Sequence, residues 1–140
     1  MIEIRRLTAA SDINALAVFL EKTFDESRPL RTAPLTEVPA GLVALAAYDD
    51  SQLVGGLVAY ELRLVSGAVE FYLYDIAVDT AFRRRGIGKA LIQELRAIAE
   101  KRGASTIFVE AEEDDTEAVD FYRSLGVEEL RVRHFNIPLE

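Results

Sequence analysis

The sequence predicts a single domain of the α/β class (α+β), built on a mixed, mostly antiparallel sheet. Three consecutive apolar segments are separated by short polar turns, which is typical of antiparallel strands. A long segment with apolar residues at helical spacing then leads to a further short apolar strand. Because a crossover helix returns the chain in the same direction, that strand should run parallel to the one before the helix.

The expected elements fill almost the whole chain. They are strands at 2–7, 42–48, 53–60, 69–78, 106–109 and 129–139 and helices at 13–24, 87–101 and 118–125. The strand at 69–78 is nearly all apolar and aromatic, so we expect it at the centre of the sheet. Three prolines interrupt any apolar periodicity between 25 and 41, which predicts a loop with one short helical turn.

The composition fits one domain spanning 1–140. A chain of 140 residues, 50% of them hydrophobic, can bury a substantial core. No apolar run reaches the ~20 residues that cross a bilayer, and the first residues lack the apolar core of a signal peptide. A cytoplasmic protein is therefore expected.

Charge and residue types narrow the chemistry. The 16 basic and 24 acidic residues leave a net charge of −8, which argues against binding to nucleic acid or to a membrane and favours a cationic partner. The absence of cysteine excludes disulfides, thiolate metal sites and a cysteine acyl-enzyme. No metal is expected.

Segment 71–101 predicts a strand, a glycine-bearing loop and a helix start, an arrangement that binds anions. Gly86 and Gly88 carry no Cβ, so their backbone N–H groups can approach a ligand closely. The first N–H groups of a helix lack intrahelical partners and lie at the positive end of its dipole. Arg83, Arg84 and Arg85 add positive charge, and we therefore expect bound phosphate.

Two common phosphate-binding patterns do not fit this loop. A dinucleotide fingerprint would need a third glycine at Leu91, and a P-loop would need Gly-Lys-Ser/Thr after four intervening residues. Dehydrogenases and P-loop kinases are therefore excluded. Taken alone, Gly-x-Gly is equally typical of a tight strand-to-helix turn.

Two motifs resemble the GNAT acyltransferase superfamily. Arg83-x-x-Gly86-x-Gly88 is similar to its acetyl-coenzyme A motif, Gln/Arg-x-x-Gly-x-Gly/Ala, and residues 118–127 match its second signature. The resemblance implies the GNAT fold, with a twisted sheet of about six to seven strands flanked by about four helices. It also implies acetyl-coenzyme A as cosubstrate.

A narrower resemblance is to the type I aminoglycoside 3-N-acetyltransferases. It rests on segments 44–48 and 72–78, on Arg83-Arg84, and on the ending 134–137. The subfamily usually ends His-Phe-Asp, whereas this chain has Asn136, a departure that bears on substrate range. The resemblance implies acetylation of an aminoglycoside 3-amino group, which confers antibiotic resistance, and it suggests a homodimer.

The superfamily resemblance also implies how the coenzyme is held. The backbone of the strand end would pair with pantetheine like an added strand, and a bulge would free an N–H near Ile76 or Ala77 for the thioester oxygen. The following loop would hold the pyrophosphate. The coenzyme-binding set is Ile76, Ala77, Val78, Arg83, Arg84, Arg85, Gly86, Ile87, Gly88 and Lys89.

Asp75, Tyr122 and Glu110 are the candidate catalytic residues. Transfer to an amine needs the amine neutral, so a carboxylate must accept a proton. Asp75 is a lone carboxylate in an apolar strand; it either contacts the amine or satisfies its own burial through a hydrogen bond. Tyr122 matches the tyrosine that the resemblance places near the sulfur, and is otherwise a core aromatic. Without cysteine, and with His134 as the only histidine, direct attack in a ternary complex is expected.

The expected acceptor is a cationic small-molecule amine. A run of carboxylates follows the strand at 106–109, and it either attracts a polycationic sugar or is a solvated loop and helix start. The substrate-binding set is Tyr74, Asp75, Glu110, Glu112, Asp114 and Asp115, with Glu70 and Tyr72 as lesser candidates.

Two alternatives remain at this stage. In the first, the same fold acetylates a protein N-terminus, a lysine or a polyamine. A peptide acceptor would need an open groove on the protein. A non-catalytic acyl-coenzyme A-binding protein would bind coenzyme without transferring the acetyl group.

Overall fold

The computed structural model describes residues 1–23 and 33–139. These residues form two compact units, Met1–Glu110 and Ala111–Glu140, which are described separately. The first unit contains β1 (Ile2–Leu7), α1 (Ala10–Thr23), β2 (Leu42–Asp49), β3 (Gln52–Arg63), β4 (Val69–Val78), a 3-10 helix (Thr80–Phe82), α2 (Ile87–Lys101) and β5 (Thr106–Val109), and the second contains α3 (Thr116–Ser124).

The described strands form one sheet in the order β1-β2-β3-β4-β5. Neighbours are antiparallel except for β4 and β5, which are parallel, as the crossover helix predicts. The expectation that segment 69–78 is the central strand is wrong. The middle strand is β3, because β5 is the sole described strand beyond β4.

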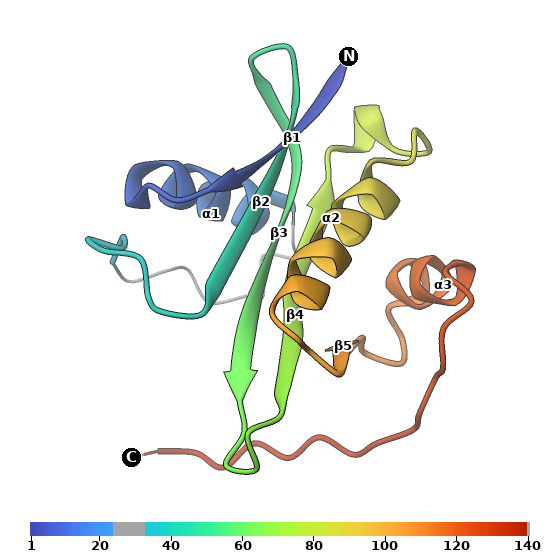
Figure 1. Cartoon of the computed structure of the whole chain (residues 1–140). Coiled ribbons are helices and arrows are strands. Elements are labelled where there is room, and N and C mark those ends of the chain that lie inside the picture. The colour runs from blue at the N-terminus through green and yellow to red at the C-terminus, as the bar shows by residue number, and fades with distance from the viewer. Residues whose placement is uncertain (24–32, 140) are drawn as a thin grey trace. The chain divides into compact units, whose positions relative to one another are not determined.

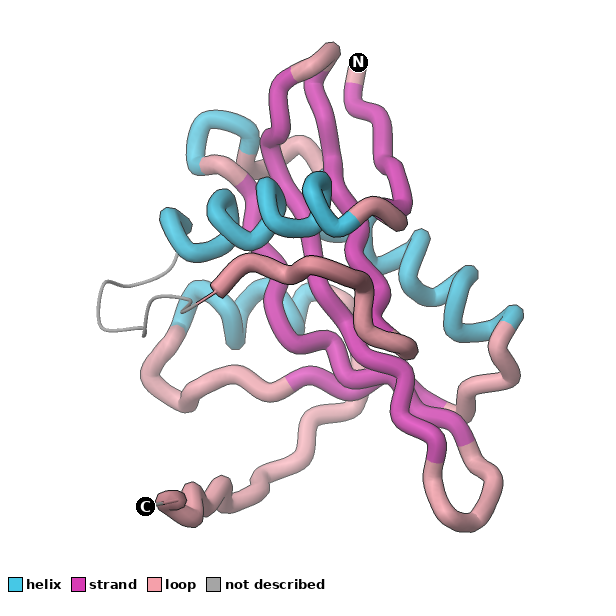
Figure 2. The backbone as a smooth tube through the Cα atoms, turned by 90° about the vertical axis from the view of Figure 1, so that its left-hand side faces the viewer, coloured by secondary structure: helices cyan, strands magenta, loops and turns pink. Residues whose placement is uncertain are grey.

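The two long helices cover opposite faces of this sheet. Figures 1 and 2 show α1 on one side of the strands and α2 on the other. Two adjacent glycines of β3 show the same arrangement, because successive residues of a strand point to opposite faces of the sheet. A Cβ built on Gly56 would meet Leu16 of α1, whereas one built on Gly55 would meet Ile87 of α2. We call these two sides the α1 face and the α2 face.

Each helix buries one apolar stripe against its face. In α2 the buried residues are Ile87, Leu91, Leu95 and Ala99, each four positions after the last, which places them on one side of the helix. The stripe confirms the predicted helix. It also fixes the start of α2 against the sheet, so the glycine loop before it has a rigid support.

Some sequence predictions need correction. The described residues contain five strands and three α-helices, fewer than the six to seven strands and four helices expected. No strand is present at 129–139, although apolar residues alternate there, because alternation predicts an extended chain and a strand also needs a hydrogen-bonded neighbour. In this segment Leu130, Val132 and Phe135 are exposed.

The predicted loop at 25–41 is only partly described. Its described residues, 33–41, form neither helix nor strand. Two hydrogen bonds of 2.9 Å join the Asn14 side chain to the backbone of Leu35, so α1 anchors this part of the loop. The rest of the predicted loop, and Phe24 of the predicted helix, lie outside the described residues. In the described ranges, no helix has the length and apolar character to span a membrane.

Replacing Gly56 by alanine should destabilise the first unit. The new Cβ would lie 2.8 Å from the Leu45 carbonyl oxygen and would overlap Leu16, so the strand or α1 must shift. Overpacking of this kind costs about 1–3 kcal/mol of unfolding free energy, measurable by urea denaturation. Gly55→Ala is the matched control: its nearest contacts are 3.2–3.4 Å and its cost should be smaller. Equal midpoints for the two variants would contradict this packing.

Candidate active site

A β-bulge interrupts β4 near its end. Leu73 pairs with Ala59, and Asp75 pairs with the preceding residue of β3, Val58, so Tyr74 is the extra residue. The structure thus contains the bulge that the family resemblance implies for this strand. It also settles which face Asp75 occupies. Asp75 lies opposite Val58, which shares the α1 face with Gly56 two residues before it.

Beyond the bulge, one edge of β4 is open. The ladder with β5 joins only Glu70–Leu73 to Thr106–Val109. Among the described residues, no strand pairs with Asp75–Val78 on that edge. On the other edge these residues stay paired with β3, up to Val78 opposite Gly55. A strand end held on one side and open on the other can accept a further extended chain.

The backbone groups on this open edge belong to Ile76 and Val78. The Asp79 N–H donates to the Val54 carbonyl of β3 at 2.8 Å. Since backbone groups of successive residues alternate between the two edges, those of Ala77 also face β3, and those of Ile76 and Val78 face away. Accordingly, the Val78 carbonyl accepts a hydrogen bond from Arg83 Nε at 3.3 Å.

The glycine loop follows directly and begins α2. Gly86 is the N-cap residue with φ +78°, a left-handed conformation that glycine adopts at little cost, and no side chain caps the helix there. The first intrahelical bond runs from Ala90 N–H to the Gly86 carbonyl at 3.0 Å. The N–H groups of Ile87, Gly88 and Lys89 therefore precede the helical ladder and can bind an anion.

The three arginines immediately precede this helix start in the chain. All three are exposed, and Arg84 also has a positive φ of 66°. The Arg85 guanidinium lies 4.8 Å from the centre of the Phe82 ring. The Asp79 carboxylate accepts from the Ala81 N–H at 2.9 Å and caps the short 3-10 helix that carries Phe82. The residues of the predicted coenzyme-binding set thus lie together, and they fit a phosphate-bearing ligand with an extended arm.

An aromatic and acidic cluster lies beside the bulge. The rings of Tyr72 and Phe108 stack at 4.8 Å, and Tyr74 makes edge-on contacts with Tyr72 at 5.6 Å and with Tyr60 at 6.0 Å. The Tyr72 hydroxyl donates to Glu110 Oε1 at 2.7 Å. The charge of Asp75 reaches both Tyr60 and Tyr72, since it helps to raise their pKa values. We call Tyr60, Tyr72, Tyr74, Asp75, Phe108 and Glu110 the aromatic–acid patch.

The patch is open to solvent. Tyr60 is 38% and Tyr74 52% exposed, and Asp75 is half-buried. Asp75 is therefore only partly withdrawn from solvent, and both of its expected roles remain predictions. No charged residue is buried in the described part of the chain. Burial is the main cause that raises the pKa of Tyr60, and the neighbouring Tyr74 and Asp75 raise it further. The Tyr60 hydroxyl therefore stays protonated near neutral pH.

We expect Glu110→Gln to lower the pKa of Tyr72. The hydrogen bond to Glu110, then burial and the nearby negative charges, raises the pKa of Tyr72 from 10.0 to about 12. Because the folded value lies above the unfolded one, this bond contributes its full stability below pH 10 and is lost as the pH rises toward 12. Titration of ¹³C-labelled tyrosine by NMR measures the shift, with Tyr48 as an internal control. An unchanged Tyr72 midpoint in the variant would contradict the contact.

The remaining predicted residues belong to the second unit. Asp115 is the N-cap of α3 and accepts from the Ala118 N–H at 3.1 Å, which gives its carboxylate a structural role. Tyr122 lies on α3 with its ring 5.3 Å from that of Phe121. Glu112 and Asp114 are exposed in the turn before α3. Their roles toward a substrate remain predictions.

Sequence reasoning missed two members of the patch. The sequence pattern predicts Tyr60 only as part of a hairpin strand and Phe108 only as part of a buried strand, and it makes Tyr72 a lesser candidate. The register opposes Tyr60 and Tyr72 across β3 and β4, and Tyr72 and Phe108 across β4 and β5. The aromatic residues in three successive strands could have indicated an aromatic cluster. Which of them are neighbours, however, depends on the register between the strands, and the sequence alone does not give that register.

The open edge of β4 offers backbone groups to an extended chain, and the start of α2 offers N–H groups to an anion. Residues 7–127 match the model of the acetyltransferase (GNAT) family, and the chain belongs to that family. The described residues contain no group of three or more histidine, aspartate or glutamate side chains that could hold a metal ion.

Two solved structures share this fold over nearly the whole chain. An aminoglycoside acetyltransferase from an uncultured soil metagenomic sample is 32% identical with a TM-score of 0.84, covering 100% of this chain and 99% of that one. Another from such a sample, solved in complex with sisomicin, is 28% identical with a TM-score of 0.81, covering 99% and 97%.

A sequence relative carries a different description. The [ribosomal protein bS18]-alanine N-acetyltransferase of Escherichia coli K12 is 38% identical over 69 residues, which is 49% of this chain and 47% of that protein. The chain thus matches about half the length of such curated relatives. The two kinds of relative name different acceptors.

Proposed function

We propose that this protein transfers the acetyl group of acetyl-coenzyme A to an amine of a cationic small molecule, most specifically the 3-amino group of an aminoglycoside. The observation that carries the proposal is the aromatic–acid patch at the β4 bulge. It supplies carboxylates and aromatic ring faces next to the strand edge that would hold the acetyl donor.

The coenzyme would lie along residues that fit it. Pantetheine carries amides, which would pair with the outward backbone groups of Ile76 and Val78. The pyrophosphate would accept hydrogen bonds from the first N–H groups of α2, beside the exposed arginines. When bound, the coenzyme supplies the activated acetyl thioester. The site's positive charge is local, since the chain as a whole carries −8.

The patch suits an acceptor with several positive charges. Asp75 and Glu110 attract ammonium groups, and tyrosine faces bind cations within about 6 Å of the ring centre. Tyr72 holds Oε1 of Glu110 by its hydrogen bond, and its raised pKa keeps that proton in place. Tyr72 is then no base at neutral pH. The carboxylates remain to accept the proton that the attacking amine must lose.

The transfer proceeds by direct attack of the amine on the acetyl carbonyl in a ternary complex. The chain has no cysteine that could form an acyl-enzyme, and its one histidine, His134, contacts Asn136 Oδ1 at 2.8 Å in the second unit. Tyr122 is proposed as the acid that protonates the departing thiolate. This role rests on the family motif around Tyr122.

A second candidate acceptor is the N-terminal amine of a protein. The similarity to a ribosomal-protein alanine acetyltransferase favours it. Such an acceptor has one ammonium group followed by an extended backbone, so it would depend less on several carboxylates. The aminoglycoside is preferred because the patch has two carboxylates and three exposed or partly exposed tyrosines, and because two nearly full-length structural neighbours with TM-scores of 0.84 and 0.81 are aminoglycoside acetyltransferases.

A thiol-release assay with acetyl-coenzyme A tests the proposal. The acceptor panel contains aminoglycosides with and without a free 3-amino group, a polyamine and an alanine-terminated peptide. We expect turnover with aminoglycosides, which is lost when the 3-amino group is absent. Turnover restricted to the peptide would support the second candidate. Coenzyme binding without any turnover would instead indicate a binding protein and contradict both.

A further inference from the structure

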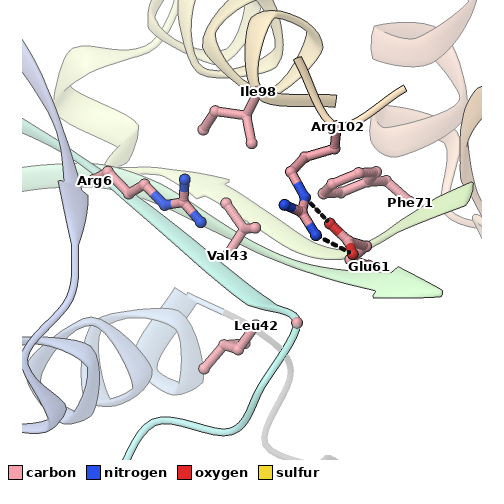
Figure 3. Close-up of a pocket in the computed structure, with 8 residues that line it drawn as sticks. Arg6, Leu42, Val43, Glu61, Phe71, Ile98 and Arg102 are labelled. Atoms are coloured by element: carbon pink, nitrogen blue, oxygen red, sulfur yellow. Dashed lines mark hydrogen bonds and ion pairs between the residues drawn. The ribbon is translucent and has the colours of Figure 1, made fainter. Parts of the chain in front are cut away.

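Two carboxylates of the first unit are held by very different partners. Figure 3 shows Glu61 bonded to Arg102, whose Nε donates at 2.6 Å and Nη2 at 2.9 Å. Arg63 Nε adds an ion pair at 2.9 Å, so the charge of Glu61 is neutralised and offers little to a cationic ligand. Glu110 instead accepts from the Tyr72 hydroxyl at 2.7 Å. A neutral hydroxyl fixes a carboxylate without cancelling its charge.

The ring that carries this hydroxyl is held on two sides. Phe108 lies opposite Tyr72 across β4 and β5, and the two rings stack at 4.8 Å with 9° between their planes. Tyr74 meets Tyr72 edge-on at 5.6 Å and 77°. Such contacts fix the orientation of the ring and therefore the place of its hydroxyl. The hydroxyl stays protonated at neutral pH because the bond to Glu110, above all, raises the pKa of Tyr72 to about 12.

The bond in turn fixes a side chain that would otherwise be free to move. Glu110 is exposed, and an exposed glutamate samples several rotamers. The bond from Tyr72 holds Oε1 at the length of a charge-assisted contact. Oε2 makes no hydrogen bond or ion pair with any residue in 1–23 or 33–139. Glu110 therefore presents a negative oxygen at a defined place.

Glu110 and Asp75 lie on the same face of the sheet. Tyr60 shares the α1 face with Gly56, four residues before it in β3, and Tyr72 lies opposite Tyr60. The bond from Tyr72 places Glu110 on this face too, where the bulge also places Asp75. One strand spacing and about one residue of rise separate their backbones, which is roughly 6 Å. One small molecule with two positive groups can therefore contact both carboxylates.

We propose that Tyr72 is a positioning residue that holds Glu110 as the anchor for a second ammonium group of the acceptor. With that group on Glu110 Oε2, the amine beside Asp75 is the neighbour of the anchored one. The anchor thus selects acceptors with two neighbouring amino groups and determines which of them is acetylated. This inference rests on the proposed function. A peptide N-terminus, with a single ammonium group, gains nothing from the anchor.

Tyr72→Phe tests the anchor, because it removes the hydroxyl and keeps the ring that stacks on Phe108. Calorimetry with sisomicin, at saturating coenzyme A so that no transfer occurs, should show a Kd about tenfold higher, the usual scale for losing a hydrogen bond to a charged group. In steady-state kinetics KM for sisomicin should rise similarly, with kcat and the KM for acetyl-coenzyme A near wild-type values. NMR of the products should show acetylation spread over several amino groups.

A double-mutant cycle shows whether Tyr72 acts through Glu110. Glu110→Gln should also weaken sisomicin binding, and adding Tyr72→Phe to it should have no further effect. Tyr48→Phe is the matched control, since it removes the same atom from a tyrosine of β2 outside the aromatic–acid patch. We expect the wild-type Kd and a single acetylated position from this control.

Three results would overturn the anchor while the wild-type enzyme still acetylates sisomicin. Tyr72→Phe could behave like Tyr48→Phe, or its effect could add to that of Glu110→Gln. A fall in kcat at unchanged KM, with an altered pH profile, would make Glu110 a proton acceptor rather than an anchor. In all three the proposed function survives. Wild-type protein that neither binds nor acetylates sisomicin would overturn both.

Discussion

Asp75→Asn should lower kcat/KM for an amine acceptor by about a hundredfold or more, the usual scale for losing a general base. The substitution keeps the shape of the side chain and removes the negative charge beside the β4 bulge. Coenzyme affinity should be unchanged, because the outward backbone groups of Ile76 and Val78 and the start of α2 remain. Steady-state kinetics with acetyl-coenzyme A, and calorimetry with coenzyme A, measure the two quantities.

Asp50→Asn is the control for this substitution. Asp50 lies in the β2–β3 turn with φ 56°, a conformation that asparagine tolerates well, so the same chemical change is made away from the patch. We expect wild-type kinetics from it. If Asp75→Asn also retains its kcat/KM, Asp75 has no part in the reaction. If KM rises while kcat is kept, Asp75 binds the acceptor without serving as its base.

Gly86→Val should abolish detectable coenzyme binding while the chain stays folded. Gly86 has φ +78°, which costs an L-residue about 1–2 kcal/mol and a β-branched one more, so the loop must rearrange. A Cβ there would meet no protein atom within 4 Å. The added side chain would therefore extend into the space where we propose that the phosphates bind. Calorimetric titration with coenzyme A measures the loss.

Gly103→Val is the control that distinguishes a blocked phosphate loop from general backbone strain in α2. Gly103 follows the other end of the same helix with φ +73°, and a Cβ there also has no neighbour within 4 Å. It should cost similar stability and leave coenzyme affinity intact. Equal loss of affinity in both variants would show that a strained α2, rather than the phosphate loop, explains the result.

The elements most accurately predicted from sequence are those with strong periodicity. Helix α2 spans Ile87–Lys101 and β4 spans Val69–Val78, both as predicted, because a regular apolar stripe and a long apolar run each determine one structure. The prediction of a strand at 129–139 is wrong for the opposite reason. Its alternation is real, but a strand is defined by a hydrogen-bonded neighbour, which no local pattern supplies.

The coenzyme loop of the candidate site could be predicted from the sequence. The aromatic–acid patch could not. The glycines and arginines of the coenzyme loop are adjacent in sequence, so their grouping needs no register. The patch joins Tyr60, Tyr72 and Phe108 from three strands, and Asp75 reaches it because Tyr74 forms a bulge. One extra residue moves every later side chain to the other face, so the face of Asp75 could not be derived from strand parity.

The central claim is that the acceptor is a small polycationic amine rather than a peptide. A direct competition tests it most simply: the protein is incubated with ¹³C-acetyl-coenzyme A and an equimolar mixture of an aminoglycoside and an alanine-terminated peptide, and the products are read by mass spectrometry. We predict the label on the aminoglycoside, at its 3-amino group by NMR, with the peptide unmodified. Label on the peptide and none on the aminoglycoside would contradict the account.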